Sequence, residues 1–201
     1  MFVTLGISPY DSLKMNKYGS FLITHVQSFA MHLLEAVAFL HSLNLAHIGL
    51  KLENLLLVSS EDVQVPSEKY DSTRSSSTSP STSIDSGGDK SLFPKPKYAD
   101  IKLINFGGAT FERDHHMSLN NIRQYRTSVV ILECGWGMTS DFCSVGCIIM
   151  DIYTRELLFQ THENYEHLAV MVKINGEFPI SMVTALARHS RKYFDSSNHL
   201  I

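Results

Sequence analysis

The chain has 201 residues, a size that suits one domain or part of a larger one. Apolar residues make up 44% of the sequence, enough to bury a core over most of its length. With 17 basic and 20 acidic residues the net charge is −3, which argues against nucleic-acid binding as the main role. No apolar run approaches the about 20 residues that span a bilayer. The first ten residues lack the basic region of a secretory signal, so we expect neither a membrane segment nor a leader.

Three cysteines, Cys134, Cys143 and Cys147, are few and odd in number. They argue against a disulfide framework and favour a reducing compartment. Cys143 and Cys147 lie four residues apart inside an apolar run, so we expect packed thiols there. A reactive or metal-binding pair is the alternative interpretation.

Hydrophobic periodicity predicts the main regular elements. Apolar residues recur at helical spacing from Ile23 to His41 and form a wide stripe, which predicts a core helix. The run 55–58 predicts a short buried strand, and alternation over 101–103 predicts another that leads into a glycine turn. The apolar run 142–153 and the pattern over 168–174 predict two further helices.

Composition changes sharply after Tyr70. From Ser72 to Ser86, 11 of 15 residues are Ser or Thr, and glycines and prolines follow. Such a stretch cannot bury enough apolar surface to offset its ordering entropy, so residues 71–97 are predicted to be a disordered insertion. A phosphoacceptor segment, with Ser79-Pro80 as a proline-directed site, is the sharper alternative. Further on, the adjacent His115 and His116 have no ligand partner at metal-binding spacing, so no metal site is expected there.

Four segments, in order along the chain, resemble protein kinases. Residues His47–Asn54 resemble the catalytic loop, and Asn105–Gly107 stands where kinases have their metal-binding Asp-Phe-Gly. Residues Asp141–Ile148 resemble the start of the long central helix of the kinase C-lobe. The run Leu158–Ala169 is close to the region that marks LAMMER-type (CLK-like) kinases, especially the plant members. The chain is therefore identified by resemblance as a degenerate member of this family.

The resemblance implies a protein-kinase-like α+β fold, in the form of a mostly α-helical C-lobe with short β-hairpins. No glycine-rich phosphate loop and no Val-Ala-Ile-Lys strand stands in the sequence, so the N-lobe is expected to be absent. The expected organisation is a first part of a C-lobe over 1–70, the Ser-rich insertion over 71–97, and a second part over 98–201. The last C-lobe helices of the family are also expected to be absent.

The substitutions within the resembling segments concern the chemistry. The catalytic Asp is replaced by Gly49, and the magnesium-binding Asp is replaced by Asn105. Loss of a general base typically costs a factor of about 10²–10⁴ in rate. Lys51 matches the phosphate-contacting Lys, and Asn54 matches the second metal ligand, so the resemblance leaves Lys51 as a catalytic remnant. It leaves Lys51 and Asn54 as a nucleotide-binding remnant, and Asn54 with Asn105 as a degenerate metal site.

Other family positions are partly kept. The resemblance places the activation-segment Ser-Thr at Asn121-Ile122 and the Ala-Pro-Glu at Thr127-Ser128-Val129, so both motifs are lost. Arg123, Tyr125 and Arg126 still match that segment. Asp141 is retained, and the resemblance implies that it anchors the backbone of the catalytic loop.

The sequence thus predicts a pseudokinase fragment of a LAMMER-type Ser/Thr kinase, a protein-binding module without phosphotransfer. One alternative is a residual kinase completed by another polypeptide, and another is the product of a decayed gene copy without function. The family would use ATP and Mg²⁺, but no cofactor is expected to be used here. By resemblance the partners are those of LAMMER-type kinases, Ser/Arg-rich splicing factors, with no direct nucleic acid and no membrane. The family expectation is a nuclear location, with the cytoplasm as the alternative.

Overall fold

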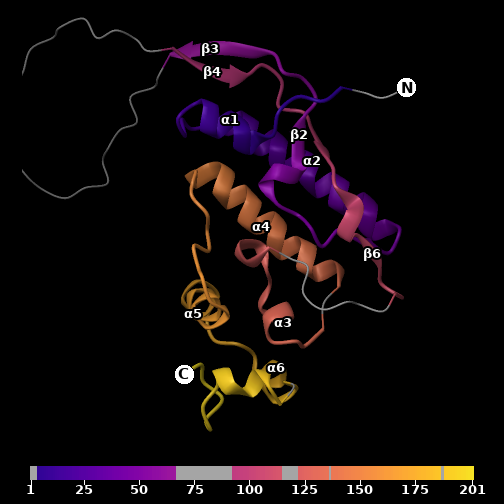
Figure 1. Cartoon of the computed structure of the whole chain (residues 1–201), viewed down its shortest axis with the longest axis vertical. Coiled ribbons are helices and arrows are strands. Elements are labelled where there is room, and N and C mark those ends of the chain that lie inside the picture. Colours follow the sequence, from indigo (N-terminus) through magenta and orange to yellow (C-terminus); the bar gives the residue numbers. More distant parts are fainter. Residues whose placement is uncertain (1–3, 67–91, 115–121, 136, 187) are drawn as a thin grey trace, which may run out of the picture.

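Two long helices, α2 (Ile23–Ser42) and α4 (Met138–Thr154), pack against each other at the centre of the molecule (Figure 1). The computed structural model describes residues 4–66, 92–114, 122–135, 137–186 and 188–201. Buried positions of α2 are spaced three or four residues apart, as expected for one face of a helix. They are Val26, Phe29, Leu33, Val37 and Leu40. The core helix predicted from periodicity is confirmed.

Within the described residues, short antiparallel strands pair in three separate two-stranded sheets. These sheets are β1 (Leu45–Ala46) with β6 (Thr110–Phe111), β2 (Leu55–Leu57) with β5 (Ile101–Leu103), and β3 (Asp62–Pro66) with β4 (Leu92–Pro96). The predicted strands over 55–58 and 101–103 are confirmed as β2 and β5. Because Leu55 pairs with Leu103, the loops on that side of both strands lie together, and this pairing positions the candidate site.

Strand β4 corrects the predicted extent of the disordered insertion, since 92–96 belongs to a regular hairpin rather than to a disordered stretch. Pro94 and Pro96 suggested a loop, but both occupy alternate pairs of the ladder, opposite Gln64 and Asp62. Every second residue of an antiparallel edge strand points its backbone N–H away from the partner, so a proline there loses no ladder hydrogen bond. The remainder of the predicted insertion, 71–91 with Ser79-Pro80, lies outside the described residues.

Helix α1 (Pro9–Met15) precedes α2 and has local reasons to start where it does. The Ser8 side-chain oxygen accepts a hydrogen bond from the backbone N–H of Asp11 at 3.0 Å. Pro9 occupies the first helical turn, where its missing N–H costs nothing. Leu13 of this helix is buried in the main core, so α1 is packed beside the loops that follow α2.

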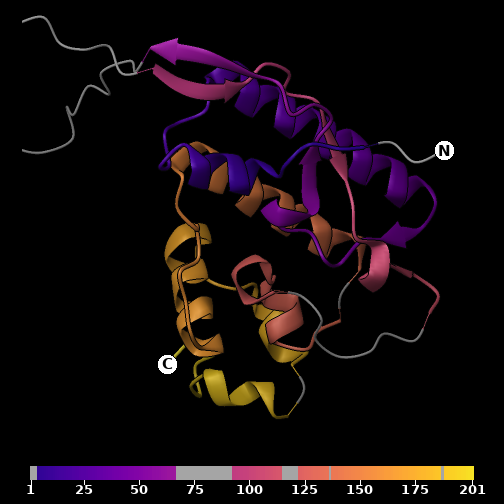
Figure 2. The same cartoon turned by 45° about the horizontal axis from the view of Figure 1, so that its top comes forward.

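A second, smaller core lies among α3 (Ser128–Ile131), α5 (Asn164–Asn175) and α6 (Ile180–Thr184). These helices lie on the side of α4 away from α2 (Figure 2), and α5 also reaches the main core through Met171. The buried side chains of the smaller core come from these helices and from the segments that follow α3 and α6. They are Ile131, Leu132, Leu168, Val183 and Phe194. The helices predicted over 142–153 and 168–174 are confirmed as parts of α4 and α5.

By length and composition alone, α2 would suffice to cross a membrane, with a mean hydropathy of 1.2. It is the one such helix in the described part of the chain, and the expectation from apolar runs had overlooked it. The finding is weak evidence, because the central helix of a globular fold passes the same test. Its buried stripe against α4 and β5 accounts for its apolar composition.

All three cysteines are free thiols. Cys147 is buried in the main core and Cys143 is half-buried beside it, which confirms the prediction of packed thiols. A hydrogen bond with Cys147 lowers the pKa of Cys143 to about 7. The same bond, together with burial, raises the pKa of Cys147.

The first testable prediction concerns the main core. Phe29 is 0% exposed and packs edge-to-face on Phe21 at 5.2 Å between ring centroids, whereas Phe39 of the same helix is 64% exposed. Phe29→Ala should lower the free energy of unfolding by about 3–5 kcal/mol, because it removes buried apolar surface and leaves a cavity. The matched control Phe39→Ala should change it by at most about 0.5 kcal/mol. Urea denaturation measures both, and equal effects would contradict this packing.

Candidate functional site

The carboxylate of Asp141, on α4, holds the backbone of the loop 47–54. This side chain is 1% exposed. Its two oxygens accept hydrogen bonds from the backbone N–H groups of His47 at 2.8 Å and Ile48 at 2.9 Å. His41 Nε2 lies 3.0 Å from the same carboxylate. Asp141 therefore anchors the loop backbone, as the resemblance implies.

Ile48 shows why this anchor matters. Its φ is +61°, a backbone conformation that β-branched residues rarely adopt. Such a conformation costs of the order of 1–3 kcal/mol and persists only where surrounding contacts impose it. The charge-assisted hydrogen bond from the Ile48 N–H to Asp141 is such a contact. The loop therefore keeps a strained shape that its own sequence disfavours.

His47 connects this loop to the glycine turn after β5. The ring is fully buried, and its Nε2 lies 3.1 Å from the carbonyl oxygen of Ile104. A carbonyl can only accept, so Nε2 carries the proton and Nδ1 is left as an acceptor, with no partner among the described residues. Burial lowers the pKa of His47 below its ordinary value. The ring also packs edge-to-face on Phe106 at 5.1 Å between centroids.

Gly49 occupies the position where the resemblance expects the catalytic Asp. A Cβ atom added here would meet only His47 atoms, the nearest at 3.7 Å, which is ordinary van der Waals contact. A Cβ atom would therefore fit at this position, but the chain places none there. The Gly49 carbonyl oxygen accepts a hydrogen bond from Asn54 Nδ2 at 2.7 Å, so its backbone is fixed as well.

The structure brings together Asn54 and Asn105, the two residues predicted as a degenerate metal site. Asn105 Nδ2 donates a hydrogen bond to Asn54 Oδ1 at 3.3 Å, so an N–H group points at an oxygen that a cation would need. Both groups are neutral amides, whereas Mg²⁺ sites in proteins are built on carboxylates. The described residues contain no group of three or more His, Cys, Asp or Glu side chains suited to a metal. The pair of amides therefore does not fit a magnesium site. His115 and His116, where no metal site was expected, lie outside the described residues.

Lys51, the predicted catalytic and nucleotide-binding remnant, lies in the same loop. Its extended backbone precedes a 3₁₀ turn over Leu52–Asn54, and its carbonyl oxygen accepts a hydrogen bond from the Asn54 N–H at 3.0 Å. The side chain is half-buried and forms no hydrogen bond or ion pair with the described residues. Lys51 is thus held near Asn54 by the backbone, without a hydrogen bond between the two side chains.

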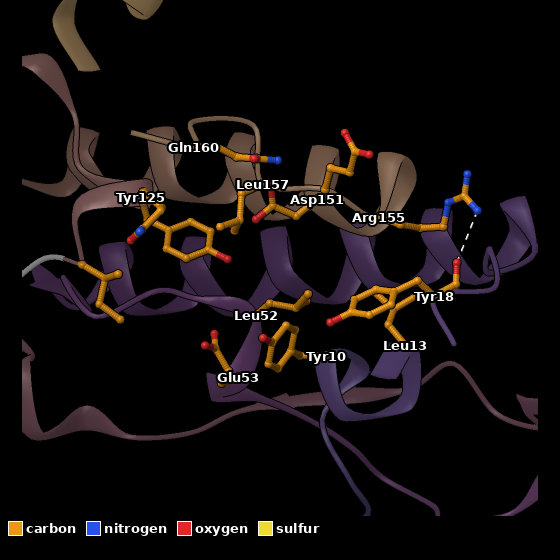
Figure 3. A pocket seen from close by; sticks show the side chains of 13 residues that line it. Tyr10, Leu13, Tyr18, Leu52, Glu53, Tyr125, Asp151, Arg155, Leu157 and Gln160 are labelled. Atoms are coloured by element: carbon orange, nitrogen blue, oxygen red, sulfur yellow. Dashed lines mark hydrogen bonds between the residues drawn. The ribbon is translucent and has the colours of Figure 1, made fainter. Parts of the chain in front are cut away.

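Sequence reasoning missed a pocket beside this loop, of about 460 Å³, between α1, the 3₁₀ turn and the end of α4 (Figure 3). Its lining is rich in acidic and tyrosine side chains. These are Glu53, Asp151, Glu156, Tyr10, Tyr18 and Tyr125. The pocket lies outside the predicted site because its walls come from segments more than 100 residues apart. Glu53, directly before Asn54, was the available signal.

The floor of the pocket is acidic and buried. Asp151 is 4% exposed, and its Oδ1 accepts a hydrogen bond from the Leu158 N–H at 2.8 Å. Burial raises the pKa of Asp151, and the nearby charge of Glu53 adds to this effect. Burial also raises the pKa of Tyr125, which faces Asp151. At the rim, Arg155 donates a hydrogen bond to the Tyr18 carbonyl oxygen at 3.3 Å (Figure 3).

His167, from the LAMMER-like region, is hydrogen-bonded to Arg126, the residue next to Tyr125 in the pocket lining. The ring is fully buried, with Nδ1 2.7 Å from the Thr161 hydroxyl and Nε2 3.0 Å from the Arg126 carbonyl oxygen. Nε2 must donate to that carbonyl, and in the neutral ring Nδ1 then accepts from the Thr161 hydroxyl. This bond ties α5 to the segment that carries Tyr125. Burial lowers the pKa of His167.

The second prediction is a loss of stability in acid. Burial holds the pKa values of His47 and His167 below the ordinary 6.5, so below that pH the unfolded chain binds protons more readily. Their contribution is complete above pH 6.5 and falls as the pH drops, by at most about 1.4 kcal/mol per pH unit for each histidine. His167→Gln should reduce this slope, whereas exposed His162→Gln should not. Urea unfolding between pH 7.5 and 5 measures it, and a flat profile contradicts it.

Comparisons with known proteins agree with this geometry. Residues 9–197 match the family model of the protein kinase domain. The chain is 44% identical over 195 residues to serine/threonine-protein kinase AFC1 of Arabidopsis thaliana, covering 96% of this chain and 39% of that protein. It is 38% identical over 194 residues to dual specificity protein kinase CLK2 of Homo sapiens, covering 96% and 34%.

A solved structure shows the same fold. The crystal structure of the PF14_0431 kinase domain superposes with a TM-score of 0.80 at 35% identity, covering 98% of this chain and 54% of that one. The kinase-like α+β fold with short antiparallel strands is confirmed. The chain spans less than half the length of the curated relatives named above, so the expected absence of an N-lobe stays a prediction.

Proposed function

The chain belongs to the protein kinase family, among the LAMMER (AFC and CLK) kinases, and we propose that it is a protein-binding homologue that does not transfer phosphate. The observation that carries the proposal is the loop 47–54. Its backbone is held by Asp141, yet position 49 offers no carboxylate. The scaffold of the catalytic loop is kept while its reactive group is not.

The chemistry of the loop supports the absence of phosphotransfer. A substrate hydroxyl must lose its proton to a positioned base, and Gly49 has no side chain to accept it. The buried His47 cannot replace it, because Nε2 already carries its proton and the unprotonated Nδ1 belongs to a ring that is fully enclosed. Asn54 and Asn105 are neutral and bonded to each other, so they do not supply the charge that holds Mg²⁺. ATP and Mg²⁺, the cofactors of the family, are therefore not expected to be used.

The acidic pocket supports protein binding. Glu53, Asp151 and Glu156 bring three carboxyl groups to one cavity, against the single guanidinium of Arg155 at its rim, and tyrosine rings form part of its walls. Carboxylates bind guanidinium groups in bidentate geometry, and aromatic faces attract the same cation. The pocket therefore suits an arginine side chain of a partner protein. Segments rich in Ser and Arg, which the family resemblance implies as partners, supply such side chains.

The third prediction tests this binding. A peptide of alternating Arg and Ser should bind the chain, and the same peptide with Gln in place of Arg should not. Glu53→Gln should weaken binding by a factor of about 10–150, because a hydrogen bond between charged groups contributes about 1.5–3 kcal/mol. The matched control Glu35→Gln, at an exposed position of α2, should leave affinity unchanged. Fluorescence anisotropy measures the affinity of the natural chain for both peptides and of both variants for the Arg/Ser peptide. Equal affinities for the two peptides would refute the pocket as the binding site.

The fourth prediction concerns activity. The chain should transfer no labelled phosphate from Mg-ATP to the Arg/Ser peptide above the level of its Lys51→Ala variant. The reason is that position 49 has no side chain to act as a base, and positions 54 and 105 hold neutral amides rather than carboxylates. Transfer that disappears in Lys51→Ala would instead favour a residual Ser/Thr kinase. The peptide-binding assay on the same sample keeps the two results separate, because binding does not depend on transfer.

A further inference from the structure

We propose that Asn54, Asn105 and the Gly49 carbonyl form an amide latch, a neutral hydrogen-bonded chain that joins the loop 47–54 to the turn 104–108 without a metal. The latch makes the folded site independent of Mg²⁺. This inference stands on the geometry of the loops alone and does not rest on the proposed function.

The hydrogen bonds of the amide latch run in one direction. Asn105 Nδ2 donates to Asn54 Oδ1 at 3.3 Å, and Asn54 Nδ2 donates to the Gly49 carbonyl oxygen at 2.7 Å. Because a carbonyl can only accept, Asn54 must present its oxygen to Asn105, which must then donate. Asn54 is 6% exposed, and its backbone carbonyl oxygen accepts a hydrogen bond from the Ile104 N–H at 2.9 Å. The central amide is therefore satisfied on both sides and enclosed.

The backbone of Asn105 makes the latch testable by a single substitution. Its φ is +66°, in the left-handed region that Asn and Asp both tolerate. Asn105→Asp therefore changes the charge and the donor but not the backbone preference. The new carboxylate would face Asn54 Oδ1 at the distance where the N–H now lies, so two acceptors would repel. A divalent cation between them would remove that repulsion.

The fifth prediction is a difference in metal response, measured by thermal unfolding in EDTA and in millimolar Mg²⁺. The midpoint of the natural chain should be the same in both. Asn105→Asp should melt about 2–4 °C lower in EDTA and recover in Mg²⁺, since it lacks one hydrogen bond unless a metal is present. Asn105→Ala should melt lower in both. Asn44→Asp, at an exposed residue with φ +55°, is the matched control and should not respond to Mg²⁺.

Two results would overturn the latch: a rise in the midpoint of the natural chain with Mg²⁺, or an Asn105→Asp variant as stable as the natural chain in EDTA. The Asn105→Asp variant could also be unfolded in EDTA, and folding on addition of Mg²⁺ would then support the latch. If it stays unfolded in Mg²⁺, a second measurement on the natural chain decides. There, paramagnetic Mn²⁺ should leave the amide NMR signals of Asn54 and Asn105 unbroadened. Selective broadening of those signals would show a metal site where the latch excludes one.

Discussion

The buried carboxylate of Asp141 is the constraint on which the rest of the site depends. A charge inside a protein is costly unless its hydrogen bonds are satisfied, and this one accepts from two backbone N–H groups with His41 alongside. It joins α4 to the end of α2 and to the loop between β1 and β2. By holding Ile48 in a strained conformation, it sets where His47, Gly49 and Asn54 lie. The remaining contacts follow from that placement.

This arrangement separates the scaffold of a kinase loop from its chemistry. Asp141 acts on backbone groups, so it holds the loop whatever side chain stands at position 49. His47 likewise fixes the turn after β5 through a backbone carbonyl, and Asn105 is tied to Asn54 by neutral amides. None of these contacts needs a nucleotide or a metal. The glycine at position 49 and the amides at positions 54 and 105 therefore leave the contacts that hold the loop backbone in place.

Long, strongly periodic segments could be predicted from the sequence, because a stripe of apolar side chains decides both helix and burial. This holds for α2 and α4. Short apolar or alternating runs also predicted the strands β2 and β5, but not that they pair with each other. Short elements such as α1, α3 and α6 carry too few residues for a period. The hairpin β3–β4 was hidden by its prolines, which an edge strand tolerates at alternate positions. Asn54 and Asn105 were predicted to belong to one site. Their hydrogen bond to each other could not be predicted, because no sequence pattern gives the distance between two side chains 51 residues apart.

The central claim is that the loop 47–54 is held by the protein's own contacts rather than by a ligand. Native-state hydrogen exchange of the His47 and Ile48 amides, followed by NMR without ATP or Mg²⁺, tests it most directly. Both amides donate to a buried carboxylate, so we expect them to exchange only when the main core opens, as slowly as the amides of α2 around Phe29. Exchange as fast as that of an unstructured peptide would contradict it. So would protection that appears only when Mg-ATP is added.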